Sequence, residues 1–397
     1  MHIAVFNQHH HNPDCPATCR HYTFLEKLAQ KHEVSLITSS GWRSIRITDN
    51  YSWEPEGVHL YEQHMPYQNK MGVSRRLFSY GGYAAYALSK GITVPKPDVI
   101  WAVSTPLSTP WAAAQVAAIR NIPWVFEVQD MWPAFPIEMG AIKNKWVQQR
   151  LYKMEKRLYQ KASHIITLSP DMEEQVISKG INPAKVTTVL NGTDIEMADA
   201  VTAADVAELR EKYNLNGKYV VLYAGTFGRA NDISGLLRAA ELLADNLNIK
   251  FFFIGSGFYE AQLKDMAERL PNVVLLLPQP RTSIFKYFKL ADLTLVSFKD
   301  LPVLASNSPS KLYDSLACGT PVLVTNPGWT KRFVSEHGCG WYSPAEQPQE
   351  LASCIQQVLN DPSELKEAGK RGQLIAQKLF DRQQLANDVE NILLKAL

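Results

Sequence analysis

The stretch VIWAVSTPLSTPWAAAQVAAIRNIPWVFEV, residues 99–128, carries the pattern from which the fold can be argued. Apolar runs at residues 99–103 and 124–128 predict buried strands, and the Ala-rich residues 111–120 between them predict a helix. Two prolines in the connection interrupt an otherwise uncharged stretch, so it is not expected to span a membrane. Continuous apolar strands joined by a helix are typical of a parallel sheet covered on both faces.

The same alternation recurs along the chain in two series. Further strands are predicted at residues 2–6, 33–38, 164–168 and 186–190, then at 219–224, 250–254, 273–277, 293–296 and 322–325, with helices at 22–31 and 234–243. Residues 194–217 separate the two series and carry no strand signal, so we place the domain junction there. The sequence therefore predicts an α/β protein with two Rossmann-like domains facing each other across a cleft, and ligands at the carboxyl ends of the strands.

The composition excludes several classes of protein. The chain has 397 residues, with 41 Lys and Arg against 39 Asp and Glu, which gives a net charge of +2. So even a balance argues against a nucleic-acid polymer as a partner. Five scattered cysteines indicate a reduced compartment rather than a disulfide framework. The first residues lack the basic and apolar regions of a signal peptide, so we expect a cytoplasmic location.

Glycine-rich turns follow two predicted strands of the second series. Gly225 follows the first strand of that series, and Gly255 and Gly257 follow the second. Glycine lets the backbone approach a ligand closely, and Arg229 nearby offers a fork of donors suited to phosphate. An ordinary tight turn is the alternative interpretation of each glycine pattern.

The segment ASNSPSKLYDSLACGTPV, residues 305–322, predicts a helix with charged groups near its start. Pro309 fits the first turn, and Ser308 is predicted as the N-cap. Lys311 opposes the positive end of the helix dipole, a placement that makes sense where the helix start binds phosphate. Asp314 lies one turn on, where a carboxylate can accept hydrogen bonds from ribose hydroxyls. The alternative is a capped surface helix with an ion pair between Lys311 and Asp314.

Several segments, in order, resemble the retaining family 4 glycosyltransferases of the GT-B fold, of the type that builds bacterial surface polysaccharides. Residues 316–322, LACGTPV, are similar to the end of that family's Glu-x7-Glu donor motif. The other similar segments are residues 126–133, 163–169, 189–194, 223–226 and 254–257.

The resemblance has consequences for the organisation and the activity of the chain. It implies an acceptor-binding domain at residues 1–197, a nucleotide-sugar-binding domain at 198–379, and a last helix, 380–397, that crosses back to the first domain. It implies transfer of a sugar, with retention, from a nucleotide sugar to a saccharide or a polyprenyl-diphosphate-linked acceptor. The nucleotide is expected to be UDP, because members of the family commonly use UDP-sugars. The resemblance implies no cofactor.

The donor site implied by the resemblance departs from the family pattern on its phosphate side. Thr226 and Asn231 stand where members often carry Arg and Lys. Arg229 and Lys311 can supply the missing positive charge and stabilise the diphosphate leaving group, which makes them catalytic candidates. The donor-binding residues implied are Gly225, Thr226, Arg229, Asn231, Gly255, Gly257, Ser306, Asn307, Ser308, Lys311 and Asp314.

Other departures concern the two sugars. The Glu-x7-Glu pair falls on Ser306, which lacks the carboxylate that holds a sugar hydroxyl, and on Asp314, which keeps an acceptor for ribose. Gln129 stands where many members have His, so Asp130 is the nearest carboxylate that can orient or deprotonate an acceptor hydroxyl. The alternative for Asp130 is a turn or N-cap carboxylate. Arg20 is the third acceptor-side candidate, for a phosphate, with a surface arginine as its alternative.

Residues 8–21 combine two cysteines and four histidines, which raises the question of a metal site. The cysteine spacing does not match a structural zinc site, and no second Cys/His pair follows at a suitable distance. We expect a polar loop at the end of the first strand. The chain also contains no Asp-x-Asp, so no catalytic metal is expected.

Residues 67–92 combine basic, aromatic and apolar side chains in the way an interfacial segment requires. The members are Lys70, Arg75, Arg76, Leu77, Phe78, Tyr80, Tyr83 and Tyr86, with Trp42, Arg43 and Arg46 close by in sequence. This pattern predicts a patch that binds an anionic membrane. The protein would then be peripheral, on the inner face of the cytoplasmic membrane. The alternative is an amphipathic helix packed on the first sheet.

Two rival functions share the same fold. A UDP-sugar 2-epimerase would carry additional acidic residues and histidines around the sugar, and no such set can be placed. A non-catalytic scaffold that binds nucleotide sugars is the second rival, because the carboxylate at Ser306 is missing.

Overall fold

The computed structural model describes residues 1–67 and 71–397 and divides into two compact units. The first unit contains Met1–Asp14, Cys19–Leu190 and Gln383–Leu397, and the second contains Cys15–Thr18 and Asn191–Arg382. The division therefore falls before residue 198 and after residue 379, the limits placed from the sequence for the second domain.

Hydrogen bonds of the boundary residues explain this difference. Thr193 donates to Asp314 over 2.6 Å, deep inside the second unit. Arg382 donates to Asp194 over 2.6 Å, which ties the start of the last helix to the same unit. Residue spacing alone does not reveal such contacts, so the sequence pattern located the junction only approximately.

The sheet of the first unit is parallel throughout, with the strand order β3-β2-β1-β4-β5-β6-β7. Its strands are β1 (His2–Phe6), β2 (Glu33–Ser39), β3 (Val58–Gln63), β4 (Val99–Val103), β5 (Trp124–Val128), β6 (His164–Thr167) and β7 (Val186–Thr188). All five residues of β1, β4 and β5 are buried, which is why continuous apolar runs identified them.

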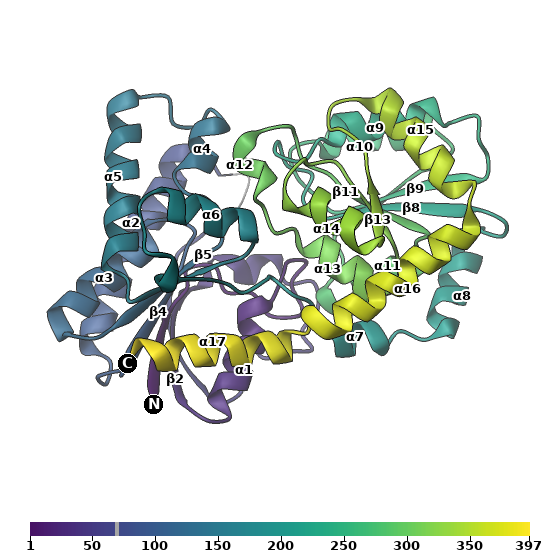
Figure 1. Ribbon diagram of the computed structural model, residues 1–397. Coiled ribbons are helices and arrows are strands. Elements are labelled where there is room, and N and C mark those ends of the chain that lie inside the picture. Colours follow the sequence, from purple (N-terminus) through teal and green to yellow (C-terminus); the bar gives the residue numbers. More distant parts are fainter. Residues whose placement is uncertain (68–70) are drawn as a thin grey trace. The chain divides into compact units, whose positions relative to one another are not determined.

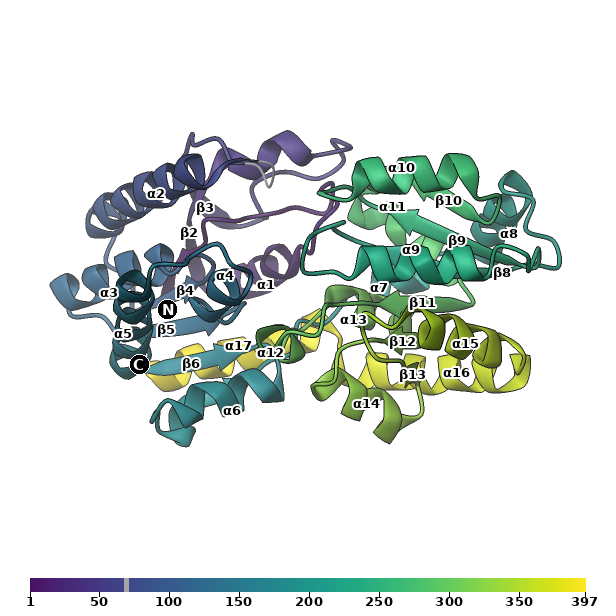
Figure 2. The same ribbon diagram turned by 90° about the horizontal axis from the view of Figure 1, so that it is seen from above.

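Helices cover both faces of this sheet (Figure 1). They are α1 (Arg20–Ala29), α2 (Val73–Thr93), α3 (Ser108–Arg120), α4 (Ala134–Glu138), α5 (Lys145–Lys161), α6 (Pro170–Ser178) and α17 (Arg382–Ala396), with 3-10 turns η1 (Ser40–Ile45) and η2 (Pro183–Lys185). Figure 2 shows α2 and α17 on opposite sides of the sheet. Phe24 of α1 and Val389 of α17 share one buried cluster with Ile3 and Trp101 of the strands. Apolar burial thus holds the last helix in the first unit.

The second unit repeats the architecture. Its sheet has the order β10-β9-β8-β11-β12-β13, again parallel. The strands are β8 (Tyr219–Ala224), β9 (Ile249–Ile254), β10 (Val273–Leu276), β11 (Leu293–Val296), β12 (Val322–Val324) and β13 (Gly340–Tyr342). The helices are α7 (Ile195–Asp199), α8 (Ala203–Lys212), α9 (Ile233–Leu242), α10 (Glu260–Arg269), α11 (Arg281–Leu290), α12 (Pro302–Ala305), α13 (Ser310–Ala317), α14 (Trp329–His337), α15 (Pro348–Leu359) and α16 (Pro362–Leu379).

Figure 1 shows α9, α10 and α15 on one side of the second sheet and α8, α11 and α13 on the other. Leu236 of α9, Leu263 of α10 and Ile355 of α15 are buried with Phe251 and Leu293 of the strands in one cluster. The expectation of two Rossmann-like α/β domains is confirmed. Across the described residues, no helix is both long and apolar enough to cross a membrane.

Candidate functional site

Two glycine turns approach each other at the carboxyl ends of β8 and β9. A Cβ at Gly255 would lie 1.9 Å from the carbonyl oxygen of Gly225, and one at Gly257 would lie 2.7 Å from that of Phe227. The φ angles of Gly225, Gly255 and Gly257 are +139°, +153° and +151°, a region that side chains disfavour. The turns that the sequence singled out therefore meet at one edge of the second sheet.

Lys311, in the first turn of α13, reaches this edge. Its Nζ lies 3.9 Å from the ring centre of Tyr223 and would be 3.3 Å from a Cβ at Gly225. Burial disfavours the ammonium form and lowers the pKa of Lys311 to about 7. Among the described residues, no carboxylate forms an ion pair with it. A cation held without a counter-charge beside a helix start has the chemistry of an anion site.

Arg229 lies in the turn after β8 and is exposed. Its guanidinium carbon lies 4.0 Å from the centre of the Phe258 ring, a cation–π contact. Thr226 is also exposed, and its carbonyl oxygen accepts a hydrogen bond of 3.0 Å from the Asn231 side chain. Asn231 therefore shapes the turn, and its amide group does not replace the positive charge of a lysine.

Asp314 differs from its expected role. Only 3% of the residue is exposed, and its carboxylate takes a bidentate pair of 2.6 Å hydrogen bonds from Arg281. The hydroxyl of Thr193 donates to it as well, over 2.6 Å. The ion pair between Lys311 and Asp314 that we considered as an alternative is absent from the described structure, because Arg281 occupies the carboxylate.

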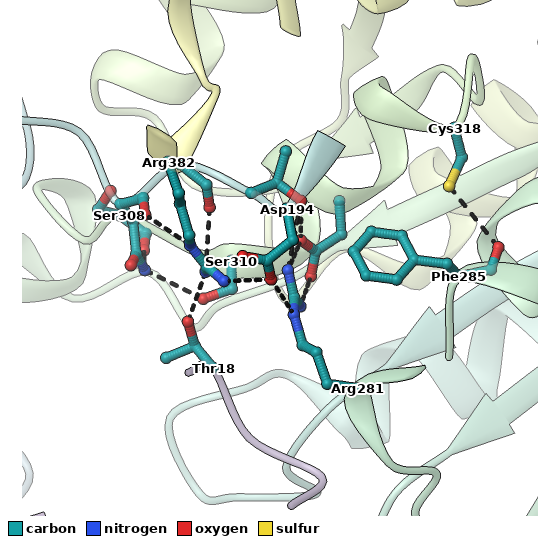
Figure 3. Close-up of polar contacts among 12 residues, drawn as sticks. Thr18, Asp194, Arg281, Phe285, Ser308, Ser310, Cys318 and Arg382 are labelled. Atoms are coloured by element: carbon teal, nitrogen blue, oxygen red, sulfur yellow. Dashed lines mark hydrogen bonds and ion pairs between the residues drawn. The ribbon is translucent and has the colours of Figure 1, made fainter. Parts of the chain in front are cut away.

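The pair of Arg281 and Asp314 belongs to a buried network in the second unit. Figure 3 shows Arg281, Asp194, Arg382 and Thr18 of this network. Arg281 also donates to Asp194 over 2.9 Å, and Arg382 donates to the same Asp194 oxygen over 2.6 Å. Arg382 extends the network to the hydroxyl of Thr18 at 2.7 Å. Sequence reasoning missed both arginines. Arg281 carried a usable signal, because it is a second cation in the first turn of a helix, like Lys311.

Three polar residues precede α13. Ser306 is fully buried and donates to the carbonyl oxygen of Val303, whereas Asn307 is half-buried. The Ser308 hydroxyl bonds to the Tyr313 hydroxyl at 2.6 Å. The N-cap prediction for Ser308 is wrong, because Pro309 occupies that position and no side chain caps the helix. The amide groups at the start of α13 therefore lack a side-chain partner at the cap.

Arg20, in the first unit, is buried rather than directed toward a phosphate. Its Nε donates to Glu127 over 3.3 Å, and a second guanidinium nitrogen donates to the carbonyl oxygen of Val189 over 3.2 Å. Burial of Glu127 favours its neutral form, but Arg20 and His21 outweigh burial and lower its pKa to about 2. Gln129 donates to the same carboxylate over 2.8 Å. The acceptor-side role expected for Arg20 therefore disagrees with the structure, because the guanidinium is used internally.

Asp130 follows β5 and is half-buried. Desolvation raises its pKa to about 6. The N-cap alternative does not hold, because α4 begins after Pro133 without a side-chain cap. A carboxylate with a pKa near neutrality at the end of a parallel strand suits proton transfer at physiological pH.

Residues 8–21 contain the cysteines and histidines that raised the question of a metal. Among the described residues, no three or more His, Cys, Asp or Glu side chains are grouped so that they could hold a metal ion. Cys15 and Cys19 are buried, and neither forms a disulfide.

Most of the segment at residues 67–92 belongs to helix α2, whereas residues 68–70, Lys70 among them, lie outside the described residues. Tyr83 of α2 is buried, and its hydroxyl donates to the carbonyl oxygen of Ile37 in β2 over 2.7 Å. This part of the helix therefore packs on the first sheet, as the alternative interpretation expected. The first turns differ, because Leu77 is 63% and Phe78 is 74% exposed. A cavity of about 510 Å³ adjoins them, lined by Met65, Pro66, Met71, Ser74, Arg75 and Phe78.

Two further arginines of the expected patch have carboxylate partners. Arg43 pairs with Glu62 at 2.8 Å, and Arg46 pairs with Asp14 at 3.1 Å. Their charge is therefore largely compensated within the protein.

Comparison with known proteins identifies the family. Residues 22–192 match the glycosyl transferase 4-like domain, and residues 205–374 match the glycosyl transferases group 1. WcaI of Escherichia coli (strain K12), named as a glycosyl transferase of colanic acid biosynthesis, is 26% identical over 317 residues, 76% of this chain and 77% of WcaI. WbjE of Pseudomonas aeruginosa, named as a glycosyltransferase, is 27% identical over 245 residues, 59% of each chain.

The solved structures agree on the fold. Anabaena Alr3699/HepE, in complex with UDP-glucose, superimposes with a TM-score of 0.70 at 17% identity, with all of both chains covered. The two family matches together extend over most of the chain, one in each unit. The chain therefore belongs to the family 4 glycosyltransferases of the GT-B fold.

Proposed function

We propose that this glycosyltransferase moves a sugar from a UDP-sugar to a hydroxyl of a lipid-linked saccharide, with retention of configuration, in the synthesis of a cell-surface polysaccharide. The names of WcaI and the UDP-glucose complex of HepE support the choice of pathway and donor. The observation that carries the donor assignment is Lys311, a cation without a carboxylate partner among the described residues, beside the turn at Gly225.

Each proposed role follows from placement. Lys311 and the start of α13 face the diphosphate, and their positive charge stabilises the UDP leaving group as charge builds on it. Arg229, exposed and stacked on Phe258, adds a second cation that can move with the ligand. The turns at Gly255 and Gly257 admit the nucleotide because they carry no side chains.

Asp130 is the candidate base for the acceptor hydroxyl. Its raised pKa, about 6, leaves it mostly ionised at neutral pH and still basic enough to accept a proton. Gln129, which the Glu127 carboxylate holds in place, is proposed to orient the same acceptor. The main role proposed for Asp314 is to position α13 through its hydrogen bonds with Arg281. Only one lone pair of its carboxylate remains to accept a hydrogen bond from the ribose.

The test is sugar transfer by the purified protein. A thermal-shift screen first selects the donor from a panel that includes UDP-glucose, because a bound ligand stabilises the folded state. Transfer to a panel of saccharide and polyprenyl-diphosphate-linked acceptors is then followed by mass spectrometry. We expect Lys311→Ala to lower turnover by about 100-fold or more and Arg229→Ala by about tenfold. Lys264→Ala, an exposed lysine of α10, is the matched control.

The outcomes separate the rival functions. Near wild-type turnover in both variants would refute the diphosphate assignment. Conversion of UDP-N-acetylglucosamine to its epimer without an acceptor would indicate a 2-epimerase, and nucleotide binding without turnover on any acceptor would indicate a scaffold.

The first turns of α2 are proposed to bring the enzyme to an anionic membrane. Leu77 and Phe78 supply exposed apolar surface, and Arg75 supplies an exposed charge for lipid headgroups. The adjoining apolar cavity offers space for part of a lipid chain.

A further inference from the structure

Aromatic rings gather around His9 at the carboxyl edge of the first sheet. The ring centre of His9 lies 5.5 Å from that of Trp42, 4.7 Å from Tyr67 and 6.4 Å from Tyr80. Tyr80 contacts Trp132 in turn, at 6.2 Å. These five residues are called the His9 cluster below.

The members of the His9 cluster come from separate segments that the fold brings together. His9 follows β1, Trp42 lies in η1 after β2, and Trp132 follows β5. The sheet order places β1 between β2 and β4, so connections leave in opposite directions at this point. Doubly wound sheets bind their ligands beyond the strand ends at such a switch point.

Hydrogen bonds fix the rings of the cluster in place. Trp42 Nε1 donates to His9 Nδ1 over 2.6 Å, and the hydroxyls of Tyr67 and Tyr80 are 3.1 Å apart. Tyr67 is buried, whereas His9, Trp42, Tyr80 and Trp132 are each half-buried. The cluster therefore presents a rigid, partly accessible aromatic surface rather than a closed core.

The cluster is electrically neutral. Burial lowers the pKa of both His9 and His11 to about 3, so each imidazole is uncharged at physiological pH. His11 contacts Trp42 at 4.8 Å between ring centres. Arg43, next to Trp42, is paired with Glu62. Arg76 adds one positive charge near Tyr80, at the border of these neutral rings.

The adjoining loop holds buried polar atoms without partners within the described structure. They are the Asn7 amide nitrogen, the Gln8 amide oxygen and His11 Nε2, and the first two residues are 3% and 0% exposed. A buried polar group without a hydrogen bond costs about 1–3 kcal/mol. A ligand rich in hydroxyls can supply the missing donors and acceptors.

We propose that the His9 cluster binds a neutral sugar ring of the acceptor, with the apolar face of the sugar on the rings of Trp42, Tyr80 and Trp132. A sugar ring has apolar C–H faces and hydroxyl edges, which match an aromatic surface bordered by neutral polar groups. The assignment of this ring to the acceptor rests on the proposed function. The presence of a sugar subsite in the first unit does not.

The test is saturation-transfer NMR on the full chain, with the aromatic resonances irradiated. Neutral methyl glycosides of glucose, galactose and N-acetylglucosamine serve as probes, and we expect transfer to the C–H protons of at least one. Tyr80→Ala and Trp132→Ala should each weaken that binding by about fivefold to tenfold. Trp146→Ala, which removes a 63% exposed ring from α5 of the same unit, is the control and should leave binding unchanged.

Milder variants guard against misfolding. Trp42→Phe keeps a ring but loses the hydrogen bond to His9, and Tyr80→Phe keeps the ring but loses the hydroxyl. Both should keep the unfolding temperature within a few degrees and still weaken glycoside binding. UDP binding, followed by thermal shift, should stay unchanged in every variant of the cluster.

Other results would overturn either the subsite, its assignment to the acceptor, or the proposed function. Absence of transfer to any glycoside at millimolar concentration, or equal binding by wild type and ring-deletion variants, removes the subsite. Displacement of the glycoside by UDP-glucose but not by UDP would place the donor sugar there instead. Glycoside binding that persists while sugar transfer fails would refute the proposed function and leave the subsite intact.

Discussion

At the scale of single residues, the pKa of Lys311 gives a prediction about pH. Burial holds this pKa at about 7 in the free protein, so the ammonium is lost as pH rises above 7. Binding of a diphosphate requires the charged form. We therefore expect the affinity for UDP to fall by about tenfold for each pH unit between 7 and 9.

Titration calorimetry or fluorescence at several pH values measures this dependence. The Lys311→Met variant has no ammonium group at this position. Any pH dependence of its affinity for UDP therefore comes from titration of UDP and not of Lys311. Parallel curves for wild type and Lys311→Met would contradict the assignment of the cation to the diphosphate.

Lys311 and Asp314, one turn apart on α13, show what the sequence pattern can and cannot predict. Lys311 was found because a cation at a helix start is unfavourable without an anion, which is a local property of the sequence. The partner of Asp314 was not found, because Arg281 lies 33 residues away and only the fold brings the two together. The expectation for Arg20 failed for the same reason, since its partner Glu127 lies on β5, 107 residues away.

At the scale of elements, the pair of Arg281 and Asp314 couples α11 to α13. Asp314→Ala leaves the buried guanidinium short of a partner, and we expect a loss of about 3–5 kcal/mol in the free energy of unfolding. Replacing both residues, Arg281→Met with Asp314→Leu, should cost less than the single change, because no unpaired charge remains there.

Urea denaturation of Arg281→Met, Asp314→Leu and their double variant closes a double-mutant cycle and gives the coupling energy. Arg269→Met, on the exposed face of α10 where it pairs with Asp265, is the control and should change stability by less than about 1 kcal/mol. A double variant less stable than Asp314→Ala would show that the pair does not act as one buried unit.

The predicted elements differ in how well the sequence located them. Strands buried along their whole length, such as β1 and β5, stood out as continuous apolar runs. β3 and β13 were missed, because each lies at the end of its sheet and most of its residues are only partly buried. β3 interrupts its apolar residues with His59, Glu62 and Gln63, and β13 has only three residues, so neither produces an apolar run.

At the scale of the whole molecule, the net charge of +2 says little about where charge acts. The buried arginines are matched by carboxylates: Arg281 and Arg382 by Asp194, and Arg20 by Glu127. Lys311 differs from them, because it is half-buried and no carboxylate of the described residues forms an ion pair with it. The near-neutral net charge therefore includes both charges that are paired inside the protein and a cation such as Lys311 that is unpaired in the described structure. The sequence alone does not distinguish the two kinds, whereas the fold does.

The proposed membrane association concerns the whole molecule, and flotation with lipid vesicles tests it. We expect the protein to float with phosphatidylglycerol vesicles at low salt and to float poorly with phosphatidylcholine, because Arg75 adds attraction to anionic headgroups. Replacing both Leu77 and Phe78 by Ser should reduce the bound fraction by about tenfold, since two exposed apolar side chains no longer enter the interface.

Leu247→Ser, which alters a 69% exposed leucine of the second unit, is the control and should float like the wild type. Arg75→Ala should weaken binding about fivefold at low salt and have little effect at high salt, because salt screens an exposed charge. Equal flotation of the wild type and the Ser double variant would place membrane contact elsewhere. Absence of flotation on anionic vesicles at low salt would mean that the exposed Leu77 and Phe78 serve another contact.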